Sequence, residues 1–367
     1  MQLDNPSAAA AMIARHSKTT LPPVMNQIPD TRNRDKAIGT WLLICCGLVF
    51  AMVVLGGFTR LTGSGLSMAE WRPIMGTLPP LSEAEWDRVF EIYKQTPEFR
   101  QVNSHMDVHD FKGIFWLEYL HRLLGRLLGF AFVLPLVYFV VRKYISWRQL
   151  PWYLLMFALG GLQAVIGKIM VASGQVDAPQ VSHYKLTAHL SAAFLVFALM
   201  FWRAQSLLYG FPGGRPHPWY PRTIALTALI AVTIVSGGFV AGLDAGLIYN
   251  TFPKMGDYWI PPDLMALEPA WRNLFDHRPT VQFDHRVLAI VTFALVVLYW
   301  FRAKGAAFSR HARIGVNALL ATAVLQVLLG ILTVVLAVPT LLAVGHQANA
   351  LLLLTSALYL LHGLRRD

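Results

Sequence analysis

Cysteine and charge are both scarce in this chain of 367 residues. The only two cysteines, Cys45 and Cys46, are adjacent and lie inside an apolar run, so they cannot build a disulfide framework or a thiolate metal site. Charged residues make up 14% of the chain and hydrophobic residues 55%, whereas a soluble domain carries about 25% charged residues. This composition argues against a soluble all-β domain and against a disordered chain.

The charge that is present is mostly basic. There are 31 Lys and Arg against 20 Asp and Glu, which gives a formal net charge of +11. In a polar protein this surplus would suggest a nucleic-acid partner. Here the basic residues gather in short segments between apolar runs, as the orientation signals of membrane proteins do. We therefore expect a polytopic protein of a bacterial inner membrane, in contact with lipid and with no nucleic-acid partner.

Eight apolar runs are long enough to cross a membrane, because about 20 apolar residues in a helix span a hydrocarbon core about 30 Å thick. The first run follows 36 mostly polar residues without a small-residue cleavage pattern, so it is not a removable signal peptide. The expected fold class is an all-α polytopic membrane protein with eight transmembrane helices. The predicted spans are 37–57, 118–141, 151–172, 186–206, 222–243, 285–303, 312–338 and 340–363.

The distribution of Lys and Arg predicts the orientation of these spans. Five segments on one side hold 17 of them, and three loops on the other side, longer in total, hold 10. The denser set belongs in the cytoplasm, so both termini are expected there and the two long loops outside. The cytoplasmic segments are 1–36, 142–150, 203–222, 302–313 and 364–367, and the outer loops are 58–117, 173–187 and 244–284.

Motifs of the first half recur in the second half in the same order. Both halves enter the membrane in the same sense, so we expect two pseudo-symmetric four-helix bundles. The matched positions are Gly56 with Gly237, His121 with His285, Gln163 with Gln326, Gly167 with Gly330, and His189 with His346. The expected division is a cytoplasmic tail 1–36, a first half 37–206, a cytoplasmic linker 207–221 and a second half 222–363.

Four histidines lie in or at the ends of apolar spans and are paired by the repeat: His121, His189, His285 and His346. An imidazole in hydrocarbon is costly unless it has a partner. Each half offers two of them on different helices near the outer face, which is what axial ligation of a haem iron needs. A structural histidine bonded to a carbonyl is the ordinary alternative for any one of the four. A closed zinc site fits less well because it needs four converging ligands.

His105 and His109 are spaced i, i+4 in the long outer loop and could bind a metal on a helix. Five charged residues stand nearby, so a solvated loop is the favoured interpretation.

The two halves differ at one position that suggests chemistry. Glu118 stands three residues before His121, and its counterpart in the second half is the neutral Gln282. A carboxylate beside a haem could act as a base or stabilise positive charge, so the first half is expected to be reactive and the second to be a permanent redox centre. The alternative is that Glu118 only pairs with Arg122, its i+4 neighbour.

Arg122 and Arg286 each follow a candidate ligand. Their guanidinium groups suit haem propionates, although snorkelling to the interface accounts for them equally well. A set of glycines is expected to let helices or a macrocycle approach closely: those at 56, 57, 63, 65, 160, 161, 167, 237, 238, 242 and 246.

At this point the chain resembles a known family, the haem A synthases, and in particular their proteobacterial and mitochondrial branch. The resemblance covers nearly all of 37–363. It rests on GGFTRLTGSGLSMAEWRPIMGTLPP (56–80), EYLHR (118–122), AHLSAA (188–193), GLDAGLIYNTFPKM (242–255), FDHR (283–286) and GHQANA (345–350). Other branches carry cysteine pairs in the outer loops, which this sequence lacks, so no mechanism that needs a loop disulfide can operate here.

The resemblance implies an enzyme that oxidises the C8 methyl of haem O to a formyl group, giving haem A for a terminal oxidase. It also implies that His121 and His189 frame the substrate haem O, that His285 and His346 ligate a haem b, and that Glu118 is catalytic. Expected partners are haem O synthase, oxidase assembly factors and a quinone or other electron acceptor.

Two bound histidines leave the iron no vacant position for O2. We therefore expect water to supply the oxygen, with Glu118 stabilising a cationic methylene or deprotonating the water; the rival is that one histidine detaches and the iron activates O2. Two other function classes use the same pattern. One is a di-haem cytochrome that only transfers electrons, and the other is a haem transporter, for which a midplane site would be expected.

Overall fold

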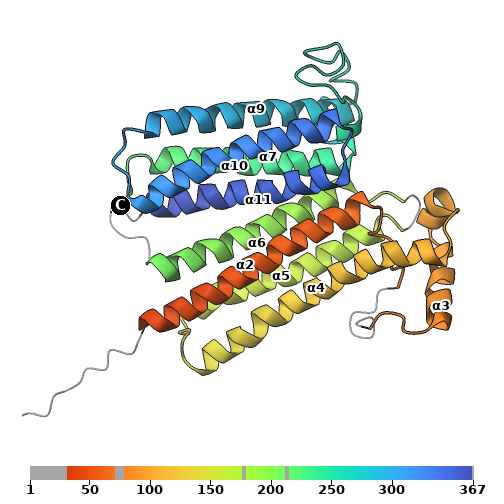
Figure 1. The fold of residues 1–367 in the computed structure, drawn as a ribbon, viewed down its shortest axis with the longest axis horizontal. Helices are drawn as coiled ribbons and strands as arrows, with labels where there is room; N and C mark the ends of the chain where they lie inside the picture. Colours follow the sequence, from red (N-terminus) through yellow and green to blue (C-terminus); the bar gives the residue numbers. More distant parts are fainter. Residues whose placement is uncertain (1–30, 71–77, 176–178, 211–214, 366–367) are drawn as a thin grey trace, which may run out of the picture.

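The computed structural model describes residues 31–70, 78–175, 179–210 and 215–365. Within these residues it contains helices and no strand, and eight of the helices are long and apolar enough to cross a membrane (Figure 1). The predicted all-α polytopic fold is thereby confirmed. The eight are α2 (Thr31–Leu61), α4 (Val108–Val141), α5 (Leu150–Ala172), α6 (His183–Tyr209), α7 (Tyr220–Gly242), α9 (Arg278–Ala303), α10 (Arg310–Val335) and α11 (Thr340–Gly363).

Several helices begin earlier than their predicted spans. α4 begins ten residues before the predicted start at 118, because the Asp107 side chain caps it by accepting hydrogen bonds from the backbone N–H groups of His109 and Asp110. Its 34 residues make it about 51 Å long, so it extends beyond a hydrocarbon core about 30 Å thick. α9 likewise begins seven residues before its predicted start. Hydropathy marks where the apolar residues begin, and the helices continue past that limit.

The projecting start of α4 carries a small outer cap. Its other elements are α3 (Glu83–Lys94) and the π-helical turn η2 (Phe99–Asn103). Aromatic side chains form the core of the cap, with Trp86, Tyr93 and Phe111 buried at 8%, 0% and 0% exposure. Figure 1 shows α3 at the end of α4, past the ends of the other helices.

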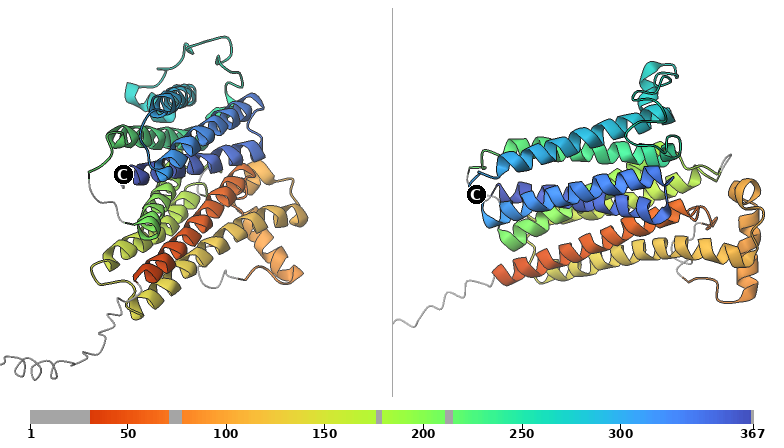
Figure 2. Two further views of the ribbon diagram at one scale, coloured as in Figure 1. Left: turned by 60° about the vertical axis from the view of Figure 1, so that its left-hand side comes forward. Right: turned by 45° about the horizontal axis from the view of Figure 1, so that its top comes forward.

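Helix neighbours follow the same order in the two halves. α2 packs on α4 and α6, and α5 packs on the same two helices. In the second half α7 packs on α9 and α11, and α10 again packs on the same two. The halves meet where α6 touches α7 and α11, and where α2 touches α11; they lie side by side in the views of Figure 2. The duplication itself stays a prediction, which this repeated order supports.

The connection between the two halves is shorter in the structure than the predicted linker. α6 continues to Tyr209 and α7 begins at Tyr220, so helix occupies part of the predicted linker 207–221. Residues 211–214, and most of the predicted tail, lie outside the described residues. Cys45 and Cys46 are free, buried members of the core between α2 and its neighbours, as expected of structural cysteines.

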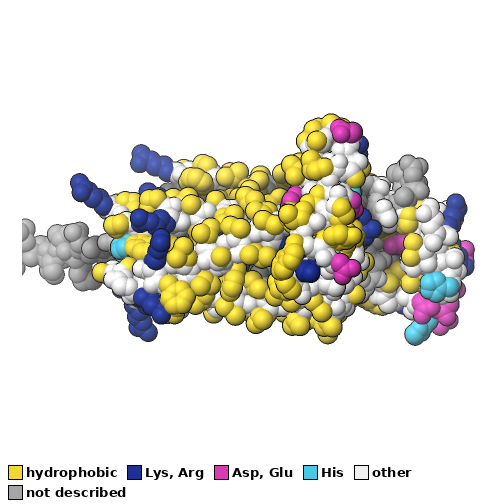
Figure 3. All heavy atoms as spheres, turned by 90° about the horizontal axis from the view of Figure 1, so that it is seen from above, with side chains coloured by type: hydrophobic (Ala, Val, Ile, Leu, Met, Phe, Trp, Pro, Cys, Tyr) yellow, Lys and Arg dark blue, Asp and Glu magenta, His cyan; other side chains and the backbone are white. Residues whose placement is uncertain are grey.

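The surface of the bundle separates apolar from charged side chains. Hydrophobic atoms cover its length, and Lys and Arg gather at one end (Figure 3). That end is where α2 begins and α11 finishes, opposite the cap (Figure 1). This distribution is the one expected when both termini face the cytoplasm.

Candidate functional site

The four candidate histidines lie on four helices that run in the same direction. His121 is on α4, His189 on α6, His285 on α9 and His346 on α11. His189 and His346 each lie six residues after the first residue of their helix, and His285 lies seven residues after it. His121 does not open its helix as predicted, since α4 begins thirteen residues earlier. The additional turns before His121 belong to the outer cap.

The second pair faces across the interior of its half. The ring centroids of His285 and His346 are 6.5 Å apart, with their planes at 88°. Two metal–nitrogen bonds of about 2.0 Å and the two ring radii add up to about this distance between the ring centroids. The donor set therefore fits a haem iron held between two imidazoles. In the first half His121 and His189 lie close enough for their charges to interact.

Each of the four rings packs against a glycine of the preceding transmembrane helix. An added Cβ would lie in tight contact with the ring in every case, so no larger residue fits without moving the imidazole. The distances from that Cβ are 3.1 Å for Gly56 to His121 Nε2, and to Cε1 of the ring 3.3 Å for Gly167 to His189, 3.0 Å for Gly237 to His285 and 2.9 Å for Gly330 to His346.

The expected close approach is confirmed at the glycines numbered 56, 57, 167, 237, 238, 242 and 246. At Gly63, Gly160 and Gly161 nothing among the described residues lies within 4 Å of an added Cβ, so no helix approaches there and the expectation is wrong for these three.

Polar side chains also contact three of the rings. The Oγ of Ser236 lies 2.8 Å from Nδ1 of His285. Gln326 Nε2 lies 3.3 Å from Nε2 of His346. Gln163, with its amide nitrogen turned to the ring, lies 3.2 Å from Nδ1 of His189. The repeat had already matched the two glutamines, whereas Ser236 was missed because its first-half counterpart is apolar.

Glu118 is buried at 3% exposure and both of its oxygens are occupied. Oε2 accepts hydrogen bonds from the Ser67 hydroxyl and the Met68 backbone N–H, both at 2.7 Å. Oε1 accepts from Arg122 Nη2 at 2.5 Å, and the same nitrogen donates to the Met68 carbonyl at 3.1 Å. The pairing with Arg122 that was considered as an alternative therefore exists. Ser67 and Met68 join the site from the quoted motif 56–80, to whose members the sequence had assigned no individual role.

The neutral counterpart is held by the outer loop in a related way. Gln282 Nε2 donates to the Tyr249 carbonyl at 3.1 Å. Arg286 donates to the same carbonyl at 2.7 Å and to those of Thr251 and Lys254 at 2.8 and 3.2 Å. Both arginines thus hold a loop against a helix that carries a histidine, and of the matched residues Glu118 and Gln282 only Glu118 is a carboxylate.

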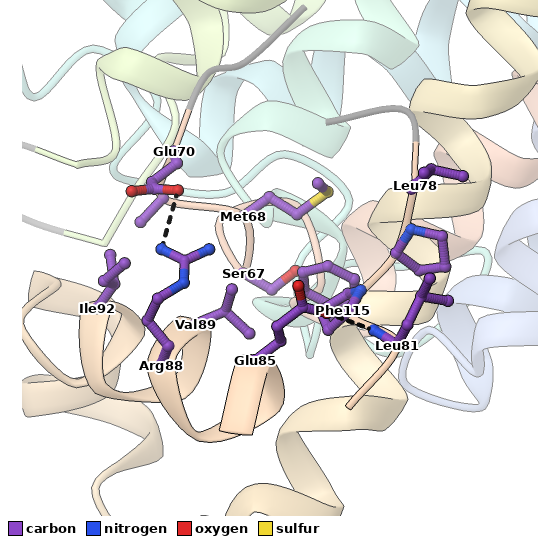
Figure 4. Close-up of a pocket in the computed structure, with 13 residues that line it drawn as sticks. Ser67, Met68, Glu70, Leu78, Leu81, Glu85, Arg88, Val89, Ile92 and Phe115 are labelled. Carbon is purple, nitrogen blue, oxygen red and sulfur yellow. Dashed lines mark hydrogen bonds and ion pairs between the residues drawn. The ribbon is translucent and has the colours of Figure 1, made fainter. Parts of the chain in front are cut away.

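A cavity of about 300 Å³ lies beside the loop that holds Glu118. Ser67 and Met68 line it together with Phe115 from α4 and residues of α3 (Figure 4). Its rim is charged, with Arg88 Nη1 at 3.5 Å from Glu70 Oε2. The contacts of Glu118 therefore border a space open to the outer side of the cap.

His105 and His109 do not form the helical i, i+4 pair. His105 precedes α4, and His109 lies in its first turn. Among the described residues, the one cluster of metal-ligand type is exposed and consists of Asp107, His109 and Asp110, which already serve as the cap of α4.

Comparisons with known proteins identify the family of the chain. The profile of the COX15-CtaA family, described as cytochrome oxidase assembly protein, matches residues 39–358. A protein of Nitrosospira multiformis named haem A synthase is 50% identical over 338 residues, which cover 91% of this chain and 95% of that protein. A haem A synthase of Nitrosomonas eutropha is 49% identical over 88% of this chain and 92% of its own length.

The similarity extends to mitochondria. Haem A synthase COX15 of Mus musculus is 41% identical over 92% of this chain and 84% of its own length. A match of this length and identity, on a fold of eight membrane-spanning helices, establishes that the chain belongs to the COX15-CtaA family of cytochrome oxidase assembly proteins.

Proposed function

We propose that this protein, like the relatives that carry the name, is a haem A synthase that converts haem O to haem A. The proposal is supported by two matched pairs of histidines, in which each ring packs against a glycine. At the matched position three residues before the first histidine of each pair, the first half has the carboxylate of Glu118 and the second half has Gln282. Two equal redox centres would need no such difference.

His285 and His346 are proposed to hold a haem b, because their rings face each other at the separation that two axial ligands require. A haem bound there supplies one-electron redox chemistry. His121 and His189 are proposed to bind the substrate haem O. Arg122 and Arg286 lie one residue past a ligand and are proposed to sit near the propionates.

Glu118 is the proposed catalytic residue. Each hydroxylation of the C8 methyl by water removes two electrons and two protons, so positive charge develops at the methyl carbon or a proton leaves the attacking water. A fixed carboxylate serves either need. Ser67, Met68 and Arg122 hold the side chain of Glu118 in one position, and the cavity lined by Ser67 and Met68 brings solvent to the residues that hold it.

The source of the oxygen separates this mechanism from its rival. In the rival, His121 or His189 leaves the iron so that O2 can be activated. Turnover in water labelled with oxygen-18 under unlabelled O2 should place the label in the hydroxylated product, which is measured before its formyl oxygen can exchange with water. Label that arrives only from O2 would end the water mechanism.

The function is tested by extracting haems from membranes that contain this protein and a source of haem O. Chromatography and mass spectrometry should find haem A or its hydroxylated precursor with the wild-type chain. His121→Ala should abolish both products. Glu118→Gln, which copies Gln282, should retain haem and lose product.

The main alternative is a di-haem cytochrome that only transfers electrons. It uses the same histidines and gives Glu118 no role beyond pairing with Arg122. Haem B alone, found despite available haem O and intact ligands, would favour that alternative.

The setting of the enzyme is also part of the proposal. The clustered basic end of the bundle supports an inner-membrane protein with both termini in the cytoplasm. Haem O synthase is a proposed source of substrate, oxidase assembly factors are proposed recipients of the product, and a quinone or another acceptor is proposed to take the electrons.

A further inference from the structure

The ring of His285 has two hydrogen-bond partners on α7, the Ser236 hydroxyl and the backbone carbonyl of Thr233. Ser236, on α7, places Oγ 2.8 Å from Nδ1 of His285. The same Oγ donates to the Thr233 carbonyl of its own helix at 2.8 Å. A hydroxyl has one proton to donate, so with that proton on the carbonyl its oxygen accepts from Nδ1–H. This arrangement leaves the lone pair on Nε2 of His285, which is then the nitrogen available to bind an iron.

The first half lacks this partner. Gly237 corresponds to Gly56, so Ser236 corresponds to Leu55, which has no polar side-chain atom. Among the described residues no side chain hydrogen-bonds the ring of His121, which corresponds to His285. The two histidines thus share a helix position and a glycine contact and differ in what holds the ring.

The difference extends along the same helix pair. Thr233 Oγ1 and Thr292 Oγ1 lie 2.9 Å apart and join α7 to α9 two helical turns past His285. Their first-half counterparts are the apolar Met52 and Leu128. The second half therefore has a hydroxyl contact that joins α7 to α9, the helix of His285, and the first half has no such contact at the matching positions.

We propose that Ser236 is the positioning residue that makes the second site a permanent haem site. Leu55, at the matching position, gives His121 no hydrogen bond, so that His121 can release the haem iron. The inference rests on the proposed function in taking His121 and His285 as haem ligands. A hydrogen bond to the second nitrogen of a ligating imidazole fixes its tautomer and orientation and raises its basicity. A substrate haem that is exchanged after each turnover needs a more weakly held imidazole, one that dissociates from the iron.

The experiment uses the full-length protein made in cells without haem O, so that only haem B is available. Three variants are compared with the wild type: Ser236→Ala, which removes the hydroxyl with little change of volume; Ser236→Leu, which copies the first half; and Ser236→Thr, which keeps a hydroxyl. The readouts are the midpoint potential of the bound haem and the fraction of reduced haem that binds carbon monoxide, a probe of ligand release.

Loss of the hydroxyl should weaken haem binding by about 10- to 100-fold, the effect typical of removing such a partner. A more basic ligand favours the oxidised iron, so the potential should rise, by about 59 mV for a tenfold change in the ratio of the two affinities. The fraction that binds carbon monoxide should rise in Ser236→Ala and Ser236→Leu and return to the wild-type level in Ser236→Thr.

An unchanged potential and no reaction with carbon monoxide in haem-loaded Ser236→Ala would overturn the role of Ser236. Wild-type protein that binds no haem B contradicts the proposed function itself, so the two failures are distinguishable. The reciprocal change, Leu55→Ser, should slow the exchange of haem bound at the first site. Unchanged exchange there would overturn the contrast between the two halves.

Discussion

Glu98 is a buried carboxyl group in the outer cap, exposed at only 7%. It accepts a hydrogen bond from the Tyr93 hydroxyl at 3.0 Å, and Asn103 donates to that hydroxyl at 2.8 Å. Burial raises the pKa of Glu98 to about 7; the Tyr93 hydrogen bond acts against this shift, and the negative charge of Glu118 adds to it. The cap therefore holds a group that titrates near neutral pH.

This pKa predicts how the stability of the cap depends on pH. Between pH 4.5 and about 7 the unfolded cap has lost the proton that the folded cap keeps, so stability falls as pH rises, by at most about 1.4 kcal/mol per pH unit. Hydrogen exchange of peptides from 83–103, corrected for intrinsic rates, should show this fall. Glu98→Gln should remove it, and Glu91→Gln, at an exposed site of α3, should keep it. A pH response in Glu98→Gln equal to that of the wild type would contradict the assignment.

Sequence patterns could predict only part of the site at this scale. The four histidines stood out because a histidine in an apolar span is costly. Ser67 and Ser236 could not be found that way, because serine is common in loops and in membrane helices. Their roles depend on which side chain the fold brings opposite them. Glu98 lies in a polar loop, and only tertiary packing buries it.

The contact between α2 and α4 depends on a glycine at the level of His121. In Gly56→Ala the new Cβ would lie 3.1 Å from Nε2 of His121, so the ring must move by a few tenths of an ångström. Such a shift of a ligand should lower conversion of haem O by about tenfold or more, because a misplacement of 1 Å can cost about 100-fold.

Gly47→Ala is the matched control on the same helix. Nothing lies within 4 Å of its Cβ, and alanine is favoured over glycine in a helix by about 1 kcal/mol. Conversion should equal that of the wild type. Equal conversion by the Gly56 and Gly47 variants, measured on extracted haems, would show that the glycine contact does not position the ligand.

At the level of elements, hydropathy predicted all eight membrane helices but made several of them too short, most of all α2 and α4. The extra turns of α4 contain charged residues such as Asp110 and Lys112, which end the apolar run. They stay helical because Asp107 caps them and because Phe111 packs in the cap. Hydropathy depends only on how apolar the residues are, so it cannot predict turns that capping and packing stabilise outside the membrane.

The orientation of the whole molecule is testable with two exposed loop residues. Leu81, in the α2–α4 loop, and Trp147, in the α4–α5 loop, are exposed at 77% and 80%. In intact spheroplasts a membrane-impermeant maleimide should label Leu81→Cys, and it should label Trp147→Cys only after the membrane is opened. The wild type is the control, since Cys45 and Cys46 are buried. The reverse pattern would invert the topology.

For the molecule as a whole, the repeat in the sequence anticipated more than the helix count. Matched offsets placed a glycine and a histidine on equivalent helices of each half, and the structure brings Gly330 against His346 as it brings Gly167 against His189. The repeat could not predict which residues connect the two halves. Gln347 donates to the Val53 carbonyl at 2.7 Å, whereas the matching position in the first half is Leu190.

The depth of the histidines has an electrical consequence. Six or seven residues of helix separate His189, His285 and His346 from the end of the bundle that carries the cap, a distance of about 9–11 Å. A charge that reaches them from that side crosses about one third of a hydrocarbon core about 30 Å thick. The energy involved is therefore about 0.8 kcal/mol per 100 mV of membrane potential, opposing a negative charge and favouring a positive one when the inside is negative, whereas full transfer involves about 2.3 kcal/mol. Redox steps at the proposed haem sites would therefore respond to only about one third of the membrane potential.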